Sequence, residues 1–180
     1  MYLFPVILPS LPPLRLIDEL CIPMKILVDA DSCPVAAREL VLRAANRTGT
    51  RTIFAANRTI PGIMGNNVEM LICSAGEGSA DDSLVTLAEP GDLAVTRDIP
   101  LAQRLLETGA AVLDDRGRIY TAENIREKLS LRDFTVGLAE NGYEFERKAA
   151  YGKRELKSFA GSFDKLLSRL LKNQQPLYGS

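Results

Sequence analysis

Five aspartates occupy positions from which their carboxylates could act together. Asp29 and Asp31 follow one apolar run, Asp98 follows another, and Asp81 and Asp82 begin a helix-forming stretch just before that second run. Gathering several carboxylates is costly unless a cation neutralises them. Such a set suits Mg²⁺ or Mn²⁺, and one or two hard cations could orient a water and stabilise the oxygens of a phosphodiester displacement.

Two similar segments must position these acids. The stretch from Lys25 to Asp29 predicts a buried strand before a Pro34-initiated helix, and the stretch 92–98 predicts a strand before a helix that contains Pro100. If the two strands are neighbours in a parallel sheet, their acids converge at its carboxyl edge, where open α/β sheets bind ligands.

Helix capping is the alternative role for some of these acids. Asp31 or Ser32 could cap the helix after Pro34, which would not exclude metal binding by Asp29. Ser79 could cap the next helix, whose positive N-terminal end would favour Asp81 or Asp82.

The remaining pattern alternates between strand and helix, which favours βαβ units. Further strands are predicted at 51–55, 68–73 and 111–113, and helices at 34–47, 80–88, 99–107, 121–139 and 155–171. The sequence therefore predicts an α/β fold: a single three-layer domain with a mainly parallel sheet. In the helix 121–139, we expect Ile125, Leu129 and Leu131 to lie in the core.

Composition limits the possible functions. The chain has 180 residues, 46% of them hydrophobic and 25% charged, with a net charge of −1, which is typical of one globular domain. A nucleic-acid partner would need a local basic patch. Basic residues crowd the segment from Arg147 to Lys172, where a solvated helix face is the favoured interpretation and a nucleic-acid footprint the alternative.

Several kinds of chemistry are excluded or disfavoured. The chain has no histidine, which rules out histidine bases and histidine metal ligands. Its three cysteines include no CxxC pair, so we expect a reducing, cytoplasmic compartment and no zinc cluster. Cys33 is interpreted as a small buried residue in preference to a reactive thiolate. No stretch has the unbroken apolar length of a membrane span.

The ends of the chain differ from its middle. Residues 1–23 contain repeated prolines, and Met24 directly precedes the first strand, so we expect a disordered or misassigned N-terminal extension. The predicted domain then covers 24–173, and 174–180 forms a tail.

Two families share parts of this pattern. A hydrophobic strand before Asp-x-Asp resembles haloacid-dehalogenase-like phosphatases, but the later aspartate pair precedes its candidate strand instead of following it. A wider set is similar to the YaiI/YqxD family of bacterial proteins, whose fold is regarded as related to the PIN domain. That set comprises residues 28–35, 79–82, 90–102, 124–126 and 131–134.

The second resemblance implies a PIN-like fold and, by analogy, a divalent-metal-dependent nuclease that favours RNA. Asp29, Asp82 (or Asp81) and Asp98 match the positions where PIN-like nucleases carry acids. We therefore expect catalytic roles for Asp29, Asp31, Asp82 and Asp98, and metal binding by Asp29, Asp81, Asp82 and Asp98, with Mg²⁺ or Mn²⁺ as the cofactor. Arg97, Arg126 and Arg132 would meet substrate phosphates, although Arg126 and Arg132 could instead pair with acids on their own helix. The alternative from another class is a non-catalytic binding module, for nucleic acid or protein, that retains the acidic pocket.

Overall fold

The sheet is the centre of the fold. The computed structural model describes residues 23–73, 79–141 and 150–174. Within them, six strands form one sheet in the order β3-β2-β1-β4-β5-β6, parallel except for β6, which runs antiparallel to β5. The strands are β1 (Ile26–Asp29), β2 (Thr52–Ala56), β3 (Val68–Ile72), β4 (Leu93–Val95), β5 (Ala111–Leu113) and β6 (Ile119–Tyr120).

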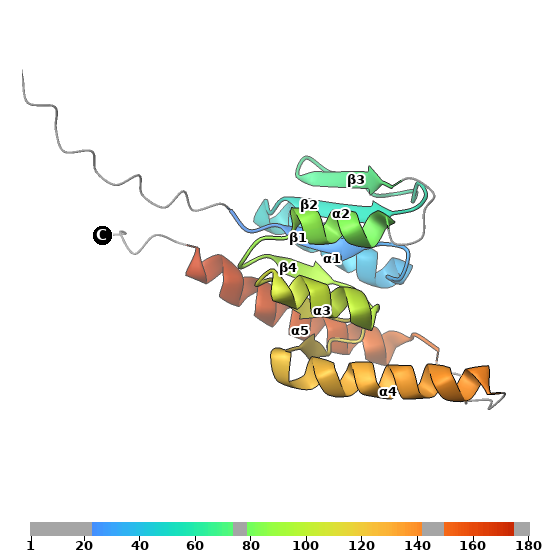
Figure 1. Ribbon diagram of the computed structural model, residues 1–180. Helices are drawn as coiled ribbons and strands as arrows, with labels where there is room; N and C mark the ends of the chain where they lie inside the picture. The colour runs from blue at the N-terminus through green and yellow to red at the C-terminus, as the bar shows by residue number, and fades with distance from the viewer. Residues whose placement is uncertain (1–22, 74–78, 142–149, 175–180) are drawn as a thin grey trace, which may run out of the picture.

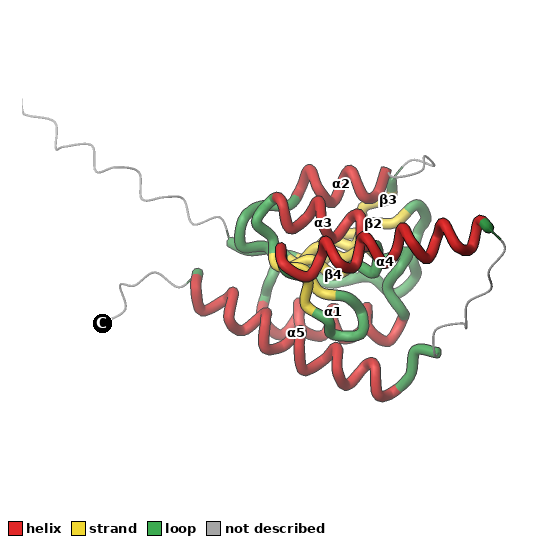
Figure 2. Tube along the Cα trace, turned by 60° about the horizontal axis from the view of Figure 1, so that its bottom comes forward, coloured by secondary structure: helices red, strands yellow, loops and turns green. Residues whose placement is uncertain are grey.

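Five helices of the described residues flank this sheet. They are α1 (Val35–Thr48), α2 (Ser79–Leu87), α3 (Ile99–Glu107), α4 (Ala122–Glu140) and α5 (Lys153–Asn173). Helices α2 and α3 cover one face of the sheet, while α1 and α5 cover the other (Figure 1). Figure 2 shows the strands between these two helical layers, with α4 beside α3. The predicted three-layer α/β architecture is confirmed.

Two hydrophobic layers hold the sheet. In β1, Ile26 and Val28 pack into the layer with α1 and α5, whereas Leu27 packs into the layer with α2 and α3. All three side chains are at most 1% exposed. A strand that is buried on both faces needs apolar residues without alternation, which is why β1 is a continuous apolar run.

The observed elements follow the predicted ones closely, with three differences. Strand β4 is limited to Leu93–Val95, which is shorter than the predicted stretch 92–98. The short strand β6 was not predicted. Leu131 was expected in the core but is 64% exposed, whereas Ile125 on the same helix is 4% exposed. Helix α4 packs through its N-terminal half against α3 and the β5–β6 side, and no element of the described residues covers Leu131.

The predicted extension and tail remain predictions. Residues 1–22 and 175–180 lie outside the described part, and so do Arg147 and Lys148 of the basic segment. None of the described helices is both long and apolar enough to cross a membrane.

A buried ion pair joins the amino ends of the two central strands. The Asp92 carboxylate accepts hydrogen bonds from the backbone N–H groups of Lys25 and Glu89, at 2.9 and 2.8 Å, and lies 2.8 Å from the Lys25 ammonium. Burial lowers the pKa of Lys25, but hydrogen bonds and charges from Asp92 and Glu89 more than offset this, so the pKa is raised. The Lys25 side chain thus stays charged although it is only 7% exposed.

Removing one partner of this pair should destabilise the fold strongly. Asp92→Ala removes the buried partner of the Lys25 ammonium, which among the described residues keeps only the half-exposed Glu89. It also leaves the N–H groups of Lys25 and Glu89 without their acceptor, so we expect the free energy of unfolding to fall by about 3 kcal/mol, the lower end of the range for breaking a buried ion pair. Urea denaturation checks this value. The control is Asp164→Ala, which breaks an ion pair with Arg47 whose side chains are 60% and 61% exposed. It should cost less than about 1 kcal/mol. Equal losses in both variants would contradict a structural role for the buried pair.

Candidate functional site

The acids that end β1 and β4 are linked by one hydroxyl group. Strands β1 and β4 are parallel neighbours with Val28 opposite Val95, so Asp29 lies beside Thr96. The Thr96 hydroxyl donates a hydrogen bond to Asp29 Oδ2 at 2.8 Å and accepts one from the backbone N–H of Asp98 at 3.0 Å. Thr96 is 1% exposed and Asp29 is 7% exposed. The two strands are therefore neighbours, as expected. The Thr96 hydroxyl links the Asp29 carboxylate to the backbone of Asp98.

Asp29 is held by hydroxyl and amide donors. The Ser32 hydroxyl donates to Asp29 Oδ2 at 2.6 Å, and the Ser32 N–H lies 3.4 Å from Oδ1. Among the described residues, no lysine or arginine forms an ion pair with this carboxylate. Asp29 is thus a nearly buried acid whose Oδ1 atom keeps most of its capacity to bind a cation or a proton donor.

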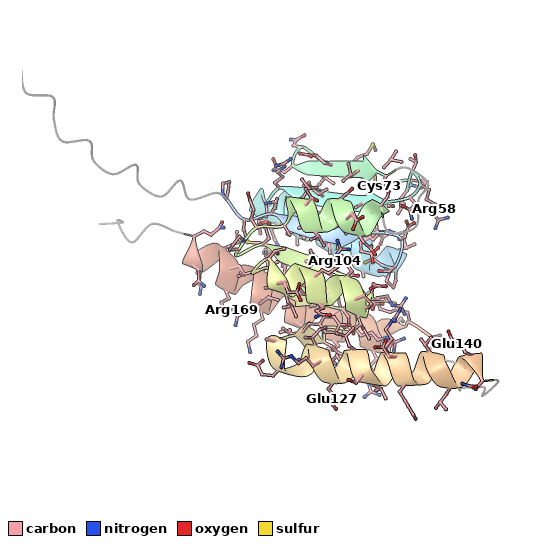
Figure 3. All side chains as sticks on the ribbon, viewed as in Figure 1. Arg58, Cys73, Arg104, Glu127, Glu140 and Arg169 are labelled. Carbon is pink, nitrogen blue, oxygen red and sulfur yellow. The ribbon has the colours of Figure 1, made fainter. Side chains whose placement is uncertain are left out.

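The two acids of α2 have different surroundings. Asp82 is paired with Arg104 of α3 at 2.7 Å, and its side chain is 70% exposed. Figure 3 shows Arg104 between α2 and α3. For Asp81, burial and then the charges of Asp29 and Asp98 raise the pKa, while Arg104 lowers it. Asp81 is therefore the acid of this pair that shares its electrostatic environment with the strand-end acids.

Asp98 caps a helix, and Asp31 does not. Asp98 Oδ1 accepts a hydrogen bond from the Leu101 N–H at 2.8 Å, at the first turn of α3. Helix α1 instead begins after Pro34 without a side-chain cap, so the expectation that Asp31 or Ser32 caps it is wrong. Ser32 is engaged with Asp29 instead.

Asp31 contacts the loop that follows β2. Its Oδ2 accepts a hydrogen bond from the Asn57 N–H at 2.7 Å, and its Oδ1 lies 3.4 Å from Arg58 Nε. Arg58 lies beyond the ends of the strands in Figure 3. Asp31 therefore connects the loop after β1 to the loop after β2, at one side of the Asp29 carboxylate.

The oxygen atoms at this edge of the sheet are of the kind that bind a hard cation, although they are not arranged around a common point. Carboxylate and hydroxyl oxygens are the ligands that Mg²⁺ and Mn²⁺ prefer. In the described part of the chain, however, no three acids or cysteines are arranged to hold one ion. At least one of Asp29, Asp81 and Asp98 would have to rotate to complete a three-carboxylate shell.

A cationic cleft adjoins the acids. It has a volume of about 520 Å³ and lies between the segment after β4, the β5–β6 turn and α4. The cations that line it are Arg97, Arg116, Arg118, Lys128 and Arg132. Arg97 and Arg132 were predicted as phosphate ligands, whereas Arg116, Arg118 and Lys128 were not. Arg116 was missed because the segment 114–117 was interpreted only as a turn, and no pattern in the sequence indicated that Arg118 and Lys128 face the same cleft. Arg126 is exposed on α4 and does not line the cleft.

Arg97 connects the acids to the cleft. Its backbone N–H and one guanidinium nitrogen lie 3.4 Å from the hydroxyl and the carbonyl oxygen of Ser32. Its Nε atom pairs with Asp115 Oδ1 at 3.2 Å. Burial raises the pKa of Asp115, and the charge of Arg97 partly lowers it. A phosphate held by Arg97 would consequently lie next to the Ser32–Asp29 hydrogen bond.

Cys33 is a buried structural residue, as expected. It is 3% exposed, and burial followed by the Asp115 charge raises the pKa of its thiol to about 12. The Arg38 guanidinium donates to the carbonyl oxygens of Cys33 and Ala30, which fixes the loop after β1. A neutral, buried thiol is not a nucleophile.

Comparison with known protein families gives a match that covers most of the described domain. The family profile "Uncharacterized BCR, YaiI/YqxD family" matches residues 27–169. The chain belongs to the YaiI/YqxD family. Similar proteins include a UPF0178 protein of Treponema denticola, 43% identical over 84% of this chain and 96% of its own length. A UPF0178 protein of Myxococcus xanthus is 42% identical over 84% of this chain and 99% of its own length. One of Vibrio atlanticus is 40% identical over 81% of this chain and 99% of its own length. No solved structure matches the chain.

The raised pKa of Asp81 predicts a pH-dependent effect on stability. A carboxyl group whose pKa is higher in the folded protein than in the unfolded chain destabilises the fold above that pKa, and has no effect well below the ordinary value of about 3.9. Asp81→Asn should therefore raise the free energy of unfolding at pH 7 in EDTA. This gain should shrink as the pH falls through the raised pKa toward the ordinary one, as measured by urea denaturation at several pH values.

Asp82→Asn is the matched control for this experiment. It removes an exposed ion pair with Arg104, so it should be neutral or cost less than about 1 kcal/mol at pH 7. A loss of stability for Asp81→Asn at pH 7 would show that the Asp81 carboxylate makes a contact that the fold needs.

Proposed function

We propose that this protein is a divalent-metal-dependent phosphodiesterase that acts on RNA or another nucleic acid. The observation that carries this proposal is the position of Asp29, Asp81 and Asp98 at the carboxyl edge of the sheet, directly beside a cationic cleft. Carboxylates that share a charge field suit a hard cation, and cations next to them suit a phosphate. An active site for phosphodiester hydrolysis needs both.

Residues of the chain supply orientation and charge. The hydroxyls of Ser32 and Thr96 hold the Asp29 carboxylate in one orientation, at 2.6 and 2.8 Å. Arg97 is 42% exposed and anchored to Asp115, so its remaining guanidinium hydrogens can bind a non-bridging phosphate oxygen. When bound at the carboxylates, Mg²⁺ or Mn²⁺ would orient a water and offset the charge that develops on the phosphoryl oxygens.

Assembling a metal shell would cost the protein few of its own hydrogen bonds. Turning Asp98 away from the Leu101 N–H would cost about 1 kcal/mol, the usual value of an N-cap. Metal that binds only the folded protein contributes about 2.7 kcal/mol when its free concentration is ~100 times the dissociation constant. Bringing like charges together without metal is unfavourable. The carboxylates can therefore remain apart without metal and assemble when it binds.

A non-catalytic binding module is the second candidate. The observation in its favour is that Asp98 and Asp31 already satisfy backbone N–H groups, of Leu101 and Asn57. In such a module, the acids would support the loops and the cleft alone would bind a partner.

Metal-dependent stability and turnover separate these candidates. Millimolar Mn²⁺ or Mg²⁺ should raise the melting temperature of the wild type, and metal should support cleavage of labelled RNA or DNA oligonucleotides. Asp29→Asn should be neutral or stabilising in EDTA, because it relieves repulsion between the carboxylates. Metal should raise the melting temperature of this variant less than that of the wild type, and its cleavage rate should fall at least about 100-fold. Asp98→Asn should behave similarly, since asparagine keeps the helix cap.

The control is Asp164→Asn, an exposed substitution on α5 that should change neither measurement. p-Nitrophenyl phosphate belongs in the substrate panel, because turnover of this monoester alone would indicate a phosphatase. If the wild type shows no metal response and Asp29→Asn is badly destabilised in EDTA, the acids are structural and the binding module is favoured.

A further inference from the structure

The β5–β6 turn holds its cations in a rigid frame. Asp114 Oδ1 accepts hydrogen bonds from the N–H groups of Arg116 and Arg118, at 2.9 and 2.8 Å. A Cβ on Gly117 would lie 2.6 Å from the Ser158 carbonyl oxygen, so the turn packs directly on the α5 backbone at a residue with φ of +81°. The Tyr151 hydroxyl donates to the Asp115 carbonyl oxygen at 2.9 Å. These contacts fix the direction of the turn before any ligand binds.

The cleft that this turn borders is strongly cationic. Five cationic and two acidic side chains line it, although the whole chain has a net charge of −1. Both acids are already engaged, Asp114 by its own turn and Asp115 by Arg97. Lys128, on the α4 wall, forms no ion pair with any other described residue, and the Arg132 pair with Asp133 is exposed and 3.5 Å long. The cleft therefore keeps positive charge for an anionic ligand.

Two further features identify the ligand more closely. Leu131 and Val136 line the same cleft and are 64% and 43% exposed, which offers an apolar surface for a flat, weakly polar group. Asp115 is 1% exposed, and its Oδ2 atom has no hydrogen-bond partner within the described residues. An orphaned buried acceptor is unfavourable and favours a ligand with a hydrogen-bond donor.

A ribonucleotide unit combines these properties, because it carries a phosphate, a base and a 2′-hydroxyl donor. A cleft of about 520 Å³ lies in the usual range for small-ligand sites and is far too small for a duplex. We propose that this cleft binds single-stranded RNA, with phosphates on Arg118, Lys128 and Arg132, and leads the strand past Arg97 to Asp29. Asp115 accepts the 2′-hydroxyl once the side chains that cover Oδ2 shift. This assignment deepens the proposed function and rests on it for the cleavage of the bound strand.

Binding without metal tests the cleft separately from catalysis. The full chain is titrated in EDTA against a fluorescein-labelled, unstructured oligouridylate, and the anisotropy gives the dissociation constant at several salt concentrations. Lys128→Glu should weaken binding by about tenfold or more. Arg118→Gln should lower the slope of log affinity against log salt by about 0.7, the value for one phosphate contact on a single strand. Arg118 is 65% exposed, so this variant tests the cleft even if Lys128→Glu folds poorly.

The matched control is Lys165→Glu. This residue lies with Arg154 and Lys157 on a basic surface made by α5 alone, and the substitution makes the same charge change. It should leave the affinity for oligouridylate unchanged. An equal loss for Lys165→Glu and Lys128→Glu, or no loss for Lys128→Glu and Arg118→Gln, would overturn the assignment of the cleft.

The role of Asp115 is tested with oligodeoxyuridylate, which lacks the 2′-hydroxyl. The wild type should bind the RNA several-fold more tightly, and Asp115→Asn should reduce this preference. Equal wild-type affinities would overturn the role of Asp115. Loss of binding in the cleft variants, together with absence of metal-dependent cleavage in the wild type, would retain the RNA cleft and reject the nuclease. Metal-dependent cleavage with unchanged RNA affinity in the cleft variants would retain the nuclease and reject the RNA cleft.

Discussion

The hydrogen bonds of the Thr96 hydroxyl are the constraint on which the site depends. This group donates to Asp29 and accepts from the Asp98 backbone, so both of its hydrogen-bonding functions are used. It reaches both partners only because Val28 lies opposite Val95. A register shift of one residue would turn the side chains of β4 to the other face of the sheet. The relative position of the acids therefore depends on the hydrophobic residues that fix this register.

The sequence predicted the parts of the structure that depend on local pattern. The repeated strand-Asp-Pro-helix arrangement placed Asp29 and Asp98 at one sheet edge, and the bounds of α3 and β5 match those predicted. It could not decide between Asp81 and Asp82, because neighbouring helix residues point about 100° apart and only the position of α3 decides which one meets Arg104.

The cationic cleft depends on tertiary structure and was missed for that reason. The turn residues Arg116 and Arg118 acquire their direction from Gly117, which packs on α5, a helix more than thirty residues further along the chain. The exposure of Leu131 also depends on tertiary structure and was mispredicted for that reason. An apolar residue at helical spacing was expected in the core, yet the layer that would cover it is absent from the described structure. Periodicity identifies an apolar face but not whether another element packs on it.

The charges that stabilise the fold and those of the candidate site lie at opposite ends of the same strands. Lys25 and Asp92 precede β1 and β4, whereas Asp29 and Asp98 follow them. Between the two ends lie only the short buried runs of β1 and β4. Evolution can therefore exchange the groups at the carboxyl ends without weakening the amino-terminal ion pair. Relatives with altered acids at the carboxyl ends would be expected to keep the Lys25–Asp92 ion pair and the buried runs of the two strands.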